Sequence, residues 1–90
     1  MATVIIIAKL MPESLDTDLS PVKAEALAFL KSEGAVHVTF EEVPIAFGLK
    51  ALMVKTDFPE EKGTDLLETR LASINGVSSV KIEDYRRALG

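Results

Sequence analysis

The segment Val43–Leu52, VPIAFGLKAL, joins two strand-like stretches near the middle of the chain. On its N-terminal side, AVHVTFEE alternates, so Val36, Val38 and Phe40 are expected to share one face of a strand. On its C-terminal side, residues 49–58 are again strand-like. The segment is therefore predicted to be the turn between two strands.

A helix is predicted before this pair of strands, from Val22 to Glu33. Its apolar residues fall at i, i+4, i+7 and i+8, which places them on one face of a helix. They are Val22, Ala26, Phe29 and Leu30. Ser20 and Pro21 are expected to be its N-cap and first residue, and Gly34 is expected to end it.

A second helix is predicted after the pair, from Thr64 to Ile74, with Leu67, Leu71 and Ile74 on one face. It ends at Asn75-Gly76, where the chain is expected to turn into the last strand.

The outermost elements are predicted to be strands. Thr3–Met11 has β-branched residues at nearly every position of its first half, which is typical of a central strand buried on both faces. The last strand is expected to begin at Val77 and to include Val80 and Ile82. The tail beyond it, EDYRRALG, is expected to be a frayed basic end on charge alone.

The element order is therefore β-α-β-β-α-β, in a single domain spanning residues 1–90. Right-handed crossovers place both helices on one face of a four-stranded antiparallel sheet. This is the ferredoxin-like α+β sandwich.

Composition narrows the classes of function. The chain has no cysteine, which excludes disulfides and thiolate metal sites, and its net charge of −4 argues against nucleic acid as the main partner. The N-terminal apolar run has no preceding basic residue and is interrupted by Lys9, so we expect neither a targeting segment nor a membrane span. A soluble, cytoplasmic protein is expected.

Few residues offer catalytic chemistry. His37 is the single histidine, and it is expected on a solvated strand face without a catalytic role. Glu13, Asp16 and Asp18 could gather a hard cation but lack the spacing of an EF-hand. Turn formation explains them better, and no metal or cofactor is predicted. No glycine motif for phosphate binding occurs.

The remaining anomaly is Phe47, an aromatic residue in an almost uncharged turn. Its side chain could fold back over the edge of the sheet, or it could anchor a partner protein, as exposed aromatics often do. The residues alone leave these alternatives open.

The run VPIAFGLKAL resembles the signature of the guanine-nucleotide exchange domain of the elongation factor 1-beta/delta family, in which eukaryotic members carry a similar Pro-Ile-x-Phe-Gly-hydrophobic-Lys-x-Leu motif. The segments MPES, DLSPVKAE and GVSSVKIEDYRR are similar to the short archaeal form. The resemblance covers essentially the whole chain.

This resemblance implies a guanine-nucleotide exchange factor that promotes GDP release from elongation factor 1-alpha and performs no covalent chemistry. The free chain is expected to be a monomer. In the family, the motif Phe contacts the GTPase, and a basic residue near the C-terminus reaches toward the Mg²⁺ position. On this hypothesis the motif Phe is wedged near the inserted cation. The partner-binding residues implied are Pro44, Ile45, Phe47, Gly48, Lys50, Arg86 and Arg87.

Arg87 aligns with a lysine of the eukaryotic members, and a shift of one residue would select Arg86 instead. The two functional alternatives are a small-molecule-binding regulatory module of the same fold and an acylphosphatase. An acylphosphatase needs a phosphate-binding loop and a catalytic asparagine. This sequence has no such loop, and its single asparagine, Asn75, is at a predicted helix end. Fold by itself separates none of these functions.

Overall fold

The computed structural model describes residues 3–87. Within this range the chain forms four strands and two α-helices in the predicted order. Their bounds are β1 (Thr3–Pro12), α1 (Leu19–Ser32), β2 (Val36–Pro44), β3 (Lys50–Pro59), α2 (Thr64–Ala72) and β4 (Val77–Arg87), with short turns η1 (Ala46–Gly48) and η2 (Glu60–Lys62).

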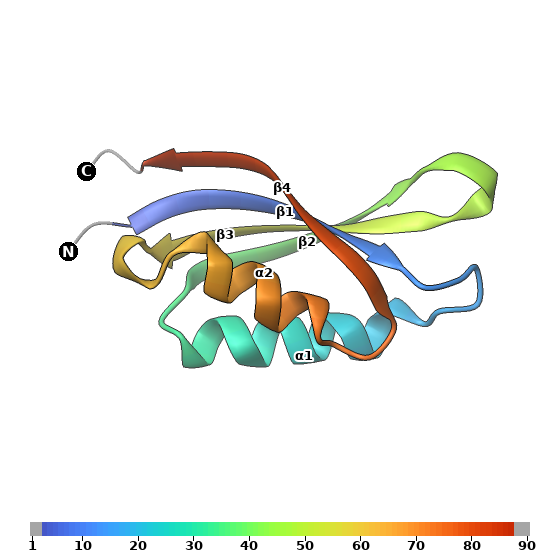
Figure 1. The fold of residues 1–90 in the computed structure, drawn as a ribbon, viewed down its shortest axis with the longest axis horizontal. Helices are drawn as coiled ribbons and strands as arrows, with labels where there is room; N and C mark the ends of the chain where they lie inside the picture. Colours follow the sequence, from blue (N-terminus) through green and yellow to red (C-terminus); the bar gives the residue numbers. More distant parts are fainter. Residues whose placement is uncertain (1–2, 88–90) are drawn as a thin grey trace.

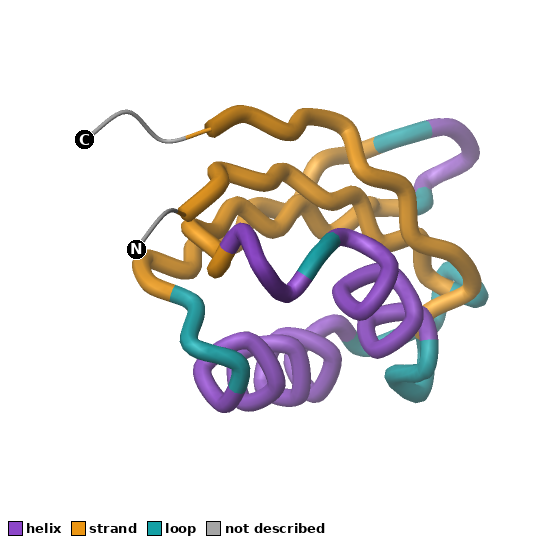
Figure 2. The backbone as a smooth tube through the Cα atoms, turned by 60° about the vertical axis from the view of Figure 1, so that its left-hand side comes forward, coloured by secondary structure: helices purple, strands orange, loops and turns teal. Residues whose placement is uncertain are grey.

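The strands form one antiparallel sheet in the order β2-β3-β1-β4. Both α1 and α2 cover the same face of this sheet, and the other face carries no helix in the part of the chain that is described (Figures 1 and 2). This arrangement confirms the predicted ferredoxin-like α+β sandwich.

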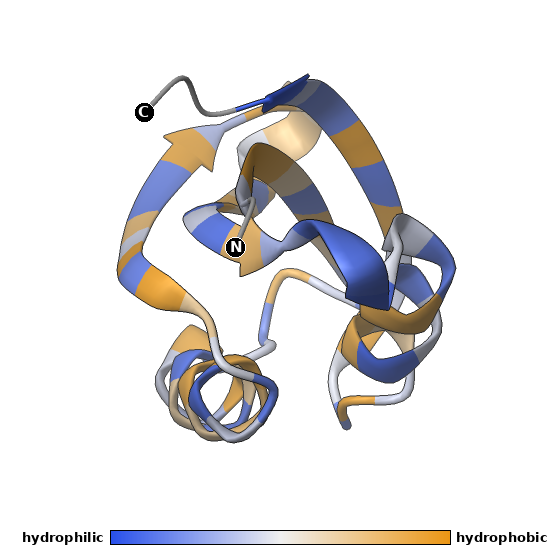
Figure 3. Cartoon of the chain, turned by 90° about the vertical axis from the view of Figure 1, so that its left-hand side faces the viewer, coloured by the Kyte–Doolittle hydropathy of each residue, from blue (hydrophilic) through white to orange (hydrophobic). Residues whose placement is uncertain are grey.

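The hydrophobic core lies between the sheet and the helices. β1 contributes Val4, Ile6, Ala8 and Leu10, each at most 2% exposed. The predicted stripes are also buried, but α2 ends at Ala72, so Ile74 lies just beyond the helix that was predicted to include it. Hydropathy alternates along the strands, as expected for a sheet with one buried face (Figure 3).

The prediction that β1 is central is confirmed, because β1 pairs with both β3 and β4. The prediction that both of its faces are buried is wrong. Ile5 and Ile7 are only partly buried, since they lie on the face without helices. β-branched residues on that face therefore remain accessible to solvent or to a partner.

Helix α1 begins earlier than expected, because its N-cap lies two residues before the predicted one. Asp18, not Ser20, is the N-cap, and its carboxylate accepts a hydrogen bond from the Ser20 backbone N–H at 3.0 Å. Pro21 thus lies inside the first turn. Gly34 follows the helix with φ of 91°, which agrees with the predicted end.

Strand β2 contains an irregularity that the alternating sequence does not predict. His37 has φ of 56°, and the register with β3 shifts between Val36 and Thr39. This shift is a β-bulge, in which β2 has one more residue than the facing part of β3. The bulge places Val36 on the face opposite that of Val38, and Val36 is 48% exposed. The expectation that Val36 shares a face with Val38 is therefore wrong.

Strand β4 is longer than expected. It continues through Arg87, with Arg86 opposite Ile5 and Arg87 opposite Val4 of β1. The prediction of a frayed end is wrong for residues 83–87, because backbone pairing with β1 holds them regardless of their polar side chains.

Candidate functional site

The turn between β2 and β3 has an uncommon backbone for its sequence. Phe47 has φ of 60° and ψ of 31°, Gly48 has φ of 78°, and the Leu49 N–H donates to the Ala46 carbonyl at 3.2 Å. Two successive central residues with positive φ are the pattern of a type I′ turn, whose first central position favours asparagine, aspartate or glycine. A phenylalanine at this position is held in a conformation that bulky residues rarely adopt.

The side chain of Phe47 is 92% exposed. It therefore does not fold back over the sheet, which excludes one of the two alternatives that the sequence left open. The hairpin projects from one end of the molecule and carries Phe47 at its tip (Figure 1). An exposed aromatic side chain on a backbone that disfavours it is typical of a functional position.

The other residues of the motif surround this tip. Pro44 pairs with Lys50 at the base of the turn, and both are exposed. Ile45 is partly buried and does not share the exposure of Phe47. The structure thus brings Pro44, Ile45, Phe47, Gly48 and Lys50 together on one hairpin.

An ion pair lies at the helix side of this hairpin. The Lys23 ammonium of α1 donates to Glu42 Oε2 of β2 at 2.8 Å, and both side chains are about one-third exposed. This hydrogen bond and the Lys23 charge hold the pKa of Glu42 below its ordinary value, with a smaller contribution from Lys50.

The ion pair between Lys23 and Glu42 is expected to make the free energy of unfolding depend on pH. Because the pKa of Glu42 is lower in the folded than in the unfolded chain, its contribution to stability is present above an unfolded pKa of about 4.3. It is lost as the pH falls through the folded pKa. Replacing Lys23 by methionine should raise the pKa of Glu42, which NMR titration of its carboxyl carbon would measure. An unchanged pKa would contradict the assignment.

The two arginines lie at the end of β4, and each contacts a carboxylate. Arg86 Nε is 2.9 Å from Asp84 Oδ2, and Arg87 Nη2 is 2.5 Å from Glu60 Oε1 of η2. Their side chains remain 75% and 74% exposed. Both guanidinium groups are therefore available to a partner that can replace these surface carboxylates.

The hairpin tip and the arginines lie at opposite ends of the molecule, which extends 41 Å along its longest axis (Figure 1). Val4 of β1 is opposite Arg87, and Leu10 is opposite Leu52 of β3, near the base of the hairpin. Six residues of strand separate Val4 from Leu10 by about 20 Å. The hypothesis that Phe47 is wedged beside the inserted cation is therefore incompatible with this fold.

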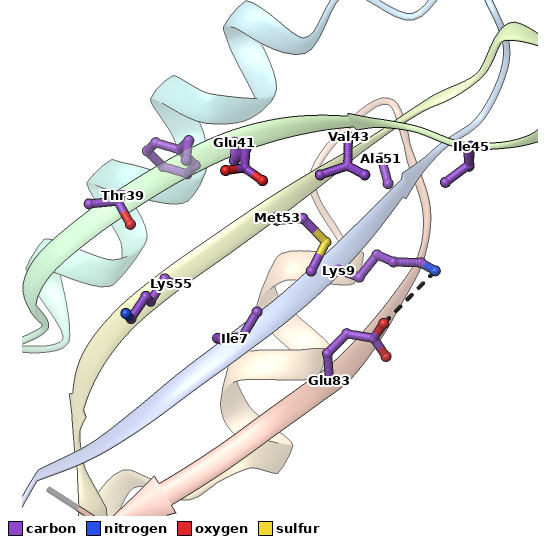
Figure 4. Close-up of a pocket in the computed structure, with 11 residues that line it drawn as sticks. Ile7, Lys9, Thr39, Glu41, Val43, Ile45, Ala51, Met53, Lys55 and Glu83 are labelled. Atoms are coloured by element: carbon purple, nitrogen blue, oxygen red, sulfur yellow. Dashed lines mark ion pairs between the residues drawn. The ribbon is translucent and has the colours of Figure 1, made fainter.

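A groove of about 430 Å³ lies on the sheet face without helices. Ile7, Val43, Ala51 and Met53 give it an apolar surface (Figure 4). The ion pair between Lys9 and Glu83, 4.0 Å apart, lies at its side (Figure 4). Ile45 also lines this groove, so the hairpin and the open sheet face are continuous.

The remaining candidate residues show no catalytic arrangement. The His37 side chain is 81% exposed, with Nδ1 3.1 Å from Asp57 Oδ2. Within residues 3–87, no group of three or more histidine, aspartate and glutamate side chains could hold a metal ion. Neither of the two described helices is long and apolar enough to cross a membrane.

One exposed apolar residue near the hairpin was missed. Leu15, in the loop between β1 and α1, is 64% exposed, and it lies beside Gly48. The signal was present in the sequence, because Leu15 is the single apolar side chain within the polar run ESLDTD. Like Phe47, Leu15 is an apolar residue at a position where turns usually carry polar residues.

A comparison with solved structures supports the fold alone. The structure resembles LarC2, the C-terminal domain of a cyclometallase involved in the synthesis of the NPN cofactor of lactate racemase, with a TM-score of 0.68 and 13% identity. The match covers 99% of this chain and 58% of that one.

Comparison with sequence families is more specific. The family model described as the EF-1 guanine nucleotide exchange domain matches residues 5–88. Proteins named elongation factor 1-beta are similar over most of their length. The one from Metallosphaera sedula is 45% identical over 89 residues, covering 97% of each chain. The one from Methanosarcina acetivorans is 42% identical over 80 residues, covering 87% of this chain and 90% of the relative. With the family model covering nearly all described residues, this chain belongs to the EF-1 guanine nucleotide exchange domain family.

Proposed function

We propose that this protein binds elongation factor 1-alpha at two separate places, through the Phe47 hairpin at one end and through the arginines of β4 at the other. Its family assignment makes it a guanine-nucleotide exchange factor for elongation factor 1-alpha in translation elongation. The hairpin and the arginines have different roles in this proposal: the hairpin anchors the complex, and the arginines act at the nucleotide site.

The observation that carries the proposal is the exposure of Phe47 on a backbone that disfavours it. A hairpin selected for stability alone would place asparagine or glycine at a φ of 60°. The side chain gains nothing from burial within the described chain, because it is 92% exposed. Its retention is explained if a partner buries it, since aromatic side chains in partner pockets dominate many interfaces.

At the other end, Arg87 or Arg86 is proposed to approach the phosphate and Mg²⁺ site of the GTPase. GDP binding is strengthened when Mg²⁺ neutralises phosphate charge, so a guanidinium placed there competes with the metal. Because the two ends are far apart, Phe47 contacts a different part of the GTPase and anchors the complex. The sheet then acts as a rigid spacer between anchor and cation.

Such a protein must bind the nucleotide-free GTPase more tightly than the GDP-bound one, because a ligand shifts an equilibrium only by its differential affinity. The linkage is reciprocal, so GDP must weaken the affinity of this protein for the GTPase by the same factor. We therefore expect added GDP to dissociate a complex formed with nucleotide-free elongation factor 1-alpha, as measured by fluorescence anisotropy. An affinity that does not change with GDP would contradict the mechanism.

The role needs no covalent chemistry, so we propose that the protein is not an enzyme and has no cofactor. We also propose that residues 1–90 form one exchange domain, that the free chain is a monomer in the cytoplasm, and that it does not bind nucleic acid directly. The regulatory-module alternative would use the open-face groove. Ligand-dependent oligomerisation in light scattering would favour that alternative.

A further inference from the structure

The loop between β1 and α1 places a second apolar side chain beside the Phe47 hairpin. Leu15 is 64% exposed and is one of four large hydrophobic side chains that are exposed within residues 3–87. The other three are Val36, Phe47 and Tyr85. Leu15 and Phe47 belong to segments that are far apart in the sequence, so their shared location is a property of the fold.

Leu15 is held in place by an ordered loop. The Ser14 N–H donates to Thr17 Oγ1 at 3.2 Å, and the Asp16 N–H donates to Ser14 Oγ at 3.3 Å. The Glu13 N–H donates to the Gly76 carbonyl at 3.0 Å, which ties the loop to the start of β4. These bonds fix the backbone on both sides of Leu15 while leaving its side chain exposed.

Leu15 also lies beside the hairpin. Its Cδ2 is 3.4 Å from the position that a Cβ atom would occupy if Gly48, the residue next to Phe47, carried one. Gly48 has φ of 78°, so glycine suits this position for its backbone conformation. The hairpin and the loop therefore present Leu15 and Phe47 on one end of the molecule, here called the apolar tip.

The charges around the apolar tip are mainly negative. The loop carries Glu13, Asp16 and Asp18 and no basic residue. Asp18 and Glu42 line a polar hollow of about 300 Å³ beside the tip, where Lys50 is the basic lining residue and the charge of Glu42 is paired with Lys23. A partner surface that receives the tip should therefore have an apolar centre and a basic border.

We infer that Leu15 is a partner-binding residue, and that Leu15 and Phe47 together enter one apolar pocket of elongation factor 1-alpha bordered by basic side chains. This inference rests on the proposed function, because it takes the GTPase as the partner. It adds a contact from a second segment of the chain, the loop between β1 and α1.

The test is the affinity of the full chain for nucleotide-free elongation factor 1-alpha, measured by calorimetry. Leu15→Ala should weaken binding by about fivefold to tenfold, as expected for an exposed leucine that becomes buried at an interface. Its melting temperature should stay close to that of the wild type, because the side chain is mostly exposed. Val36→Ala is the matched control, since Val36 is also exposed but lies on β2 near the far end of the sheet.

A double-mutant cycle tests whether Leu15 and Phe47 share one pocket. If they do, the loss in Leu15→Ala/Phe47→Ala should be smaller than the product of the two single losses. Val36→Ala and Phe47→Ala should instead combine as a simple product. Independent losses for Leu15 and Phe47 would overturn the shared pocket.

Charge substitutions at Leu15 test the basic border. Leu15→Lys should weaken binding more than Leu15→Glu, and the reverse order would overturn this part of the inference. If the wild type binds while Leu15→Ala binds equally well, the inference fails and the proposed function stands. If the wild type does not bind the GTPase at all, the proposed function itself fails.

Discussion

Replacing Phe47 by alanine is expected to reduce the acceleration of GDP release by about thirtyfold, which corresponds to the ~2 kcal/mol typical of a central aromatic contact. The loss should appear in the affinity for the nucleotide-free GTPase. The folding free energy of the free protein should change by less than about 0.5 kcal/mol, because Phe47 is exposed and makes no core contact. Stopped-flow measurement of labelled GDP release, with urea unfolding in parallel, would check both values.

The variant Phe47→Asn separates the anchoring role of Phe47 from its role in the hairpin. Asparagine is favoured at the first central position of a type I′ turn, so this variant should be more stable than the wild type by about 1 kcal/mol. It should nevertheless lose exchange activity as alanine does. A variant that is less stable, or that retains full activity, would contradict the view that Phe47 is kept for its partner.

Removing the guanidinium of Arg87 is the second substitution with a large expected effect. If Arg87 acts at the phosphate and Mg²⁺ site, Arg87→Ala removes a charged contact and should lower exchange by about tenfold to a hundredfold. Arg87→Lys should retain much of the activity, because the positive charge remains. Arg86→Ala should have a small effect, and the opposite ranking of the two alanine variants would move the role to Arg86.

The ion pair of Arg87 with Glu60 offers an independent check. Arg87 must leave Glu60 to reach a partner, and a surface ion pair of this kind is worth at most about 1 kcal/mol. Glu60→Gln should therefore increase exchange by up to about fivefold if Arg87 acts. Asp84→Asn, which releases Arg86, is the matched control and should leave exchange nearly unchanged.

The helices and the core were predictable from the sequence, because their signals are periodic and local. The stripes of α1 and α2 are buried as expected, and β1 is central as its β-branched run indicated. The one-sided burial of β1 was not predictable from its composition. Ile5 and Ile7 are apolar but face the side that no described helix covers.

The errors arose where tertiary pairing decides the outcome. Arg86 and Arg87 belong to β4 because β1 supplies a backbone partner. Their polar side chains give no sign of this pairing in the sequence. The positive φ of His37 inverts the face of Val36 without interrupting the alternating sequence. Both features depend on the register between strands, and the sequence of one strand alone does not determine that register.

The candidate site was predictable as a list of residues but not as an arrangement. The motif identified the hairpin, yet the exposure of Phe47 and its separation from Arg87 required the structure. Leu15 was missed because a single apolar residue in a polar loop is a weak signal. Its place beside Gly48 of the hairpin is visible only in the folded structure.

The most direct test of exchange activity is the release of fluorescent GDP from the matching elongation factor 1-alpha, followed at increasing concentrations of this protein. We expect the release rate to rise with concentration and to saturate as the complex forms. A release rate that stays at its basal value at every concentration would contradict the exchange function.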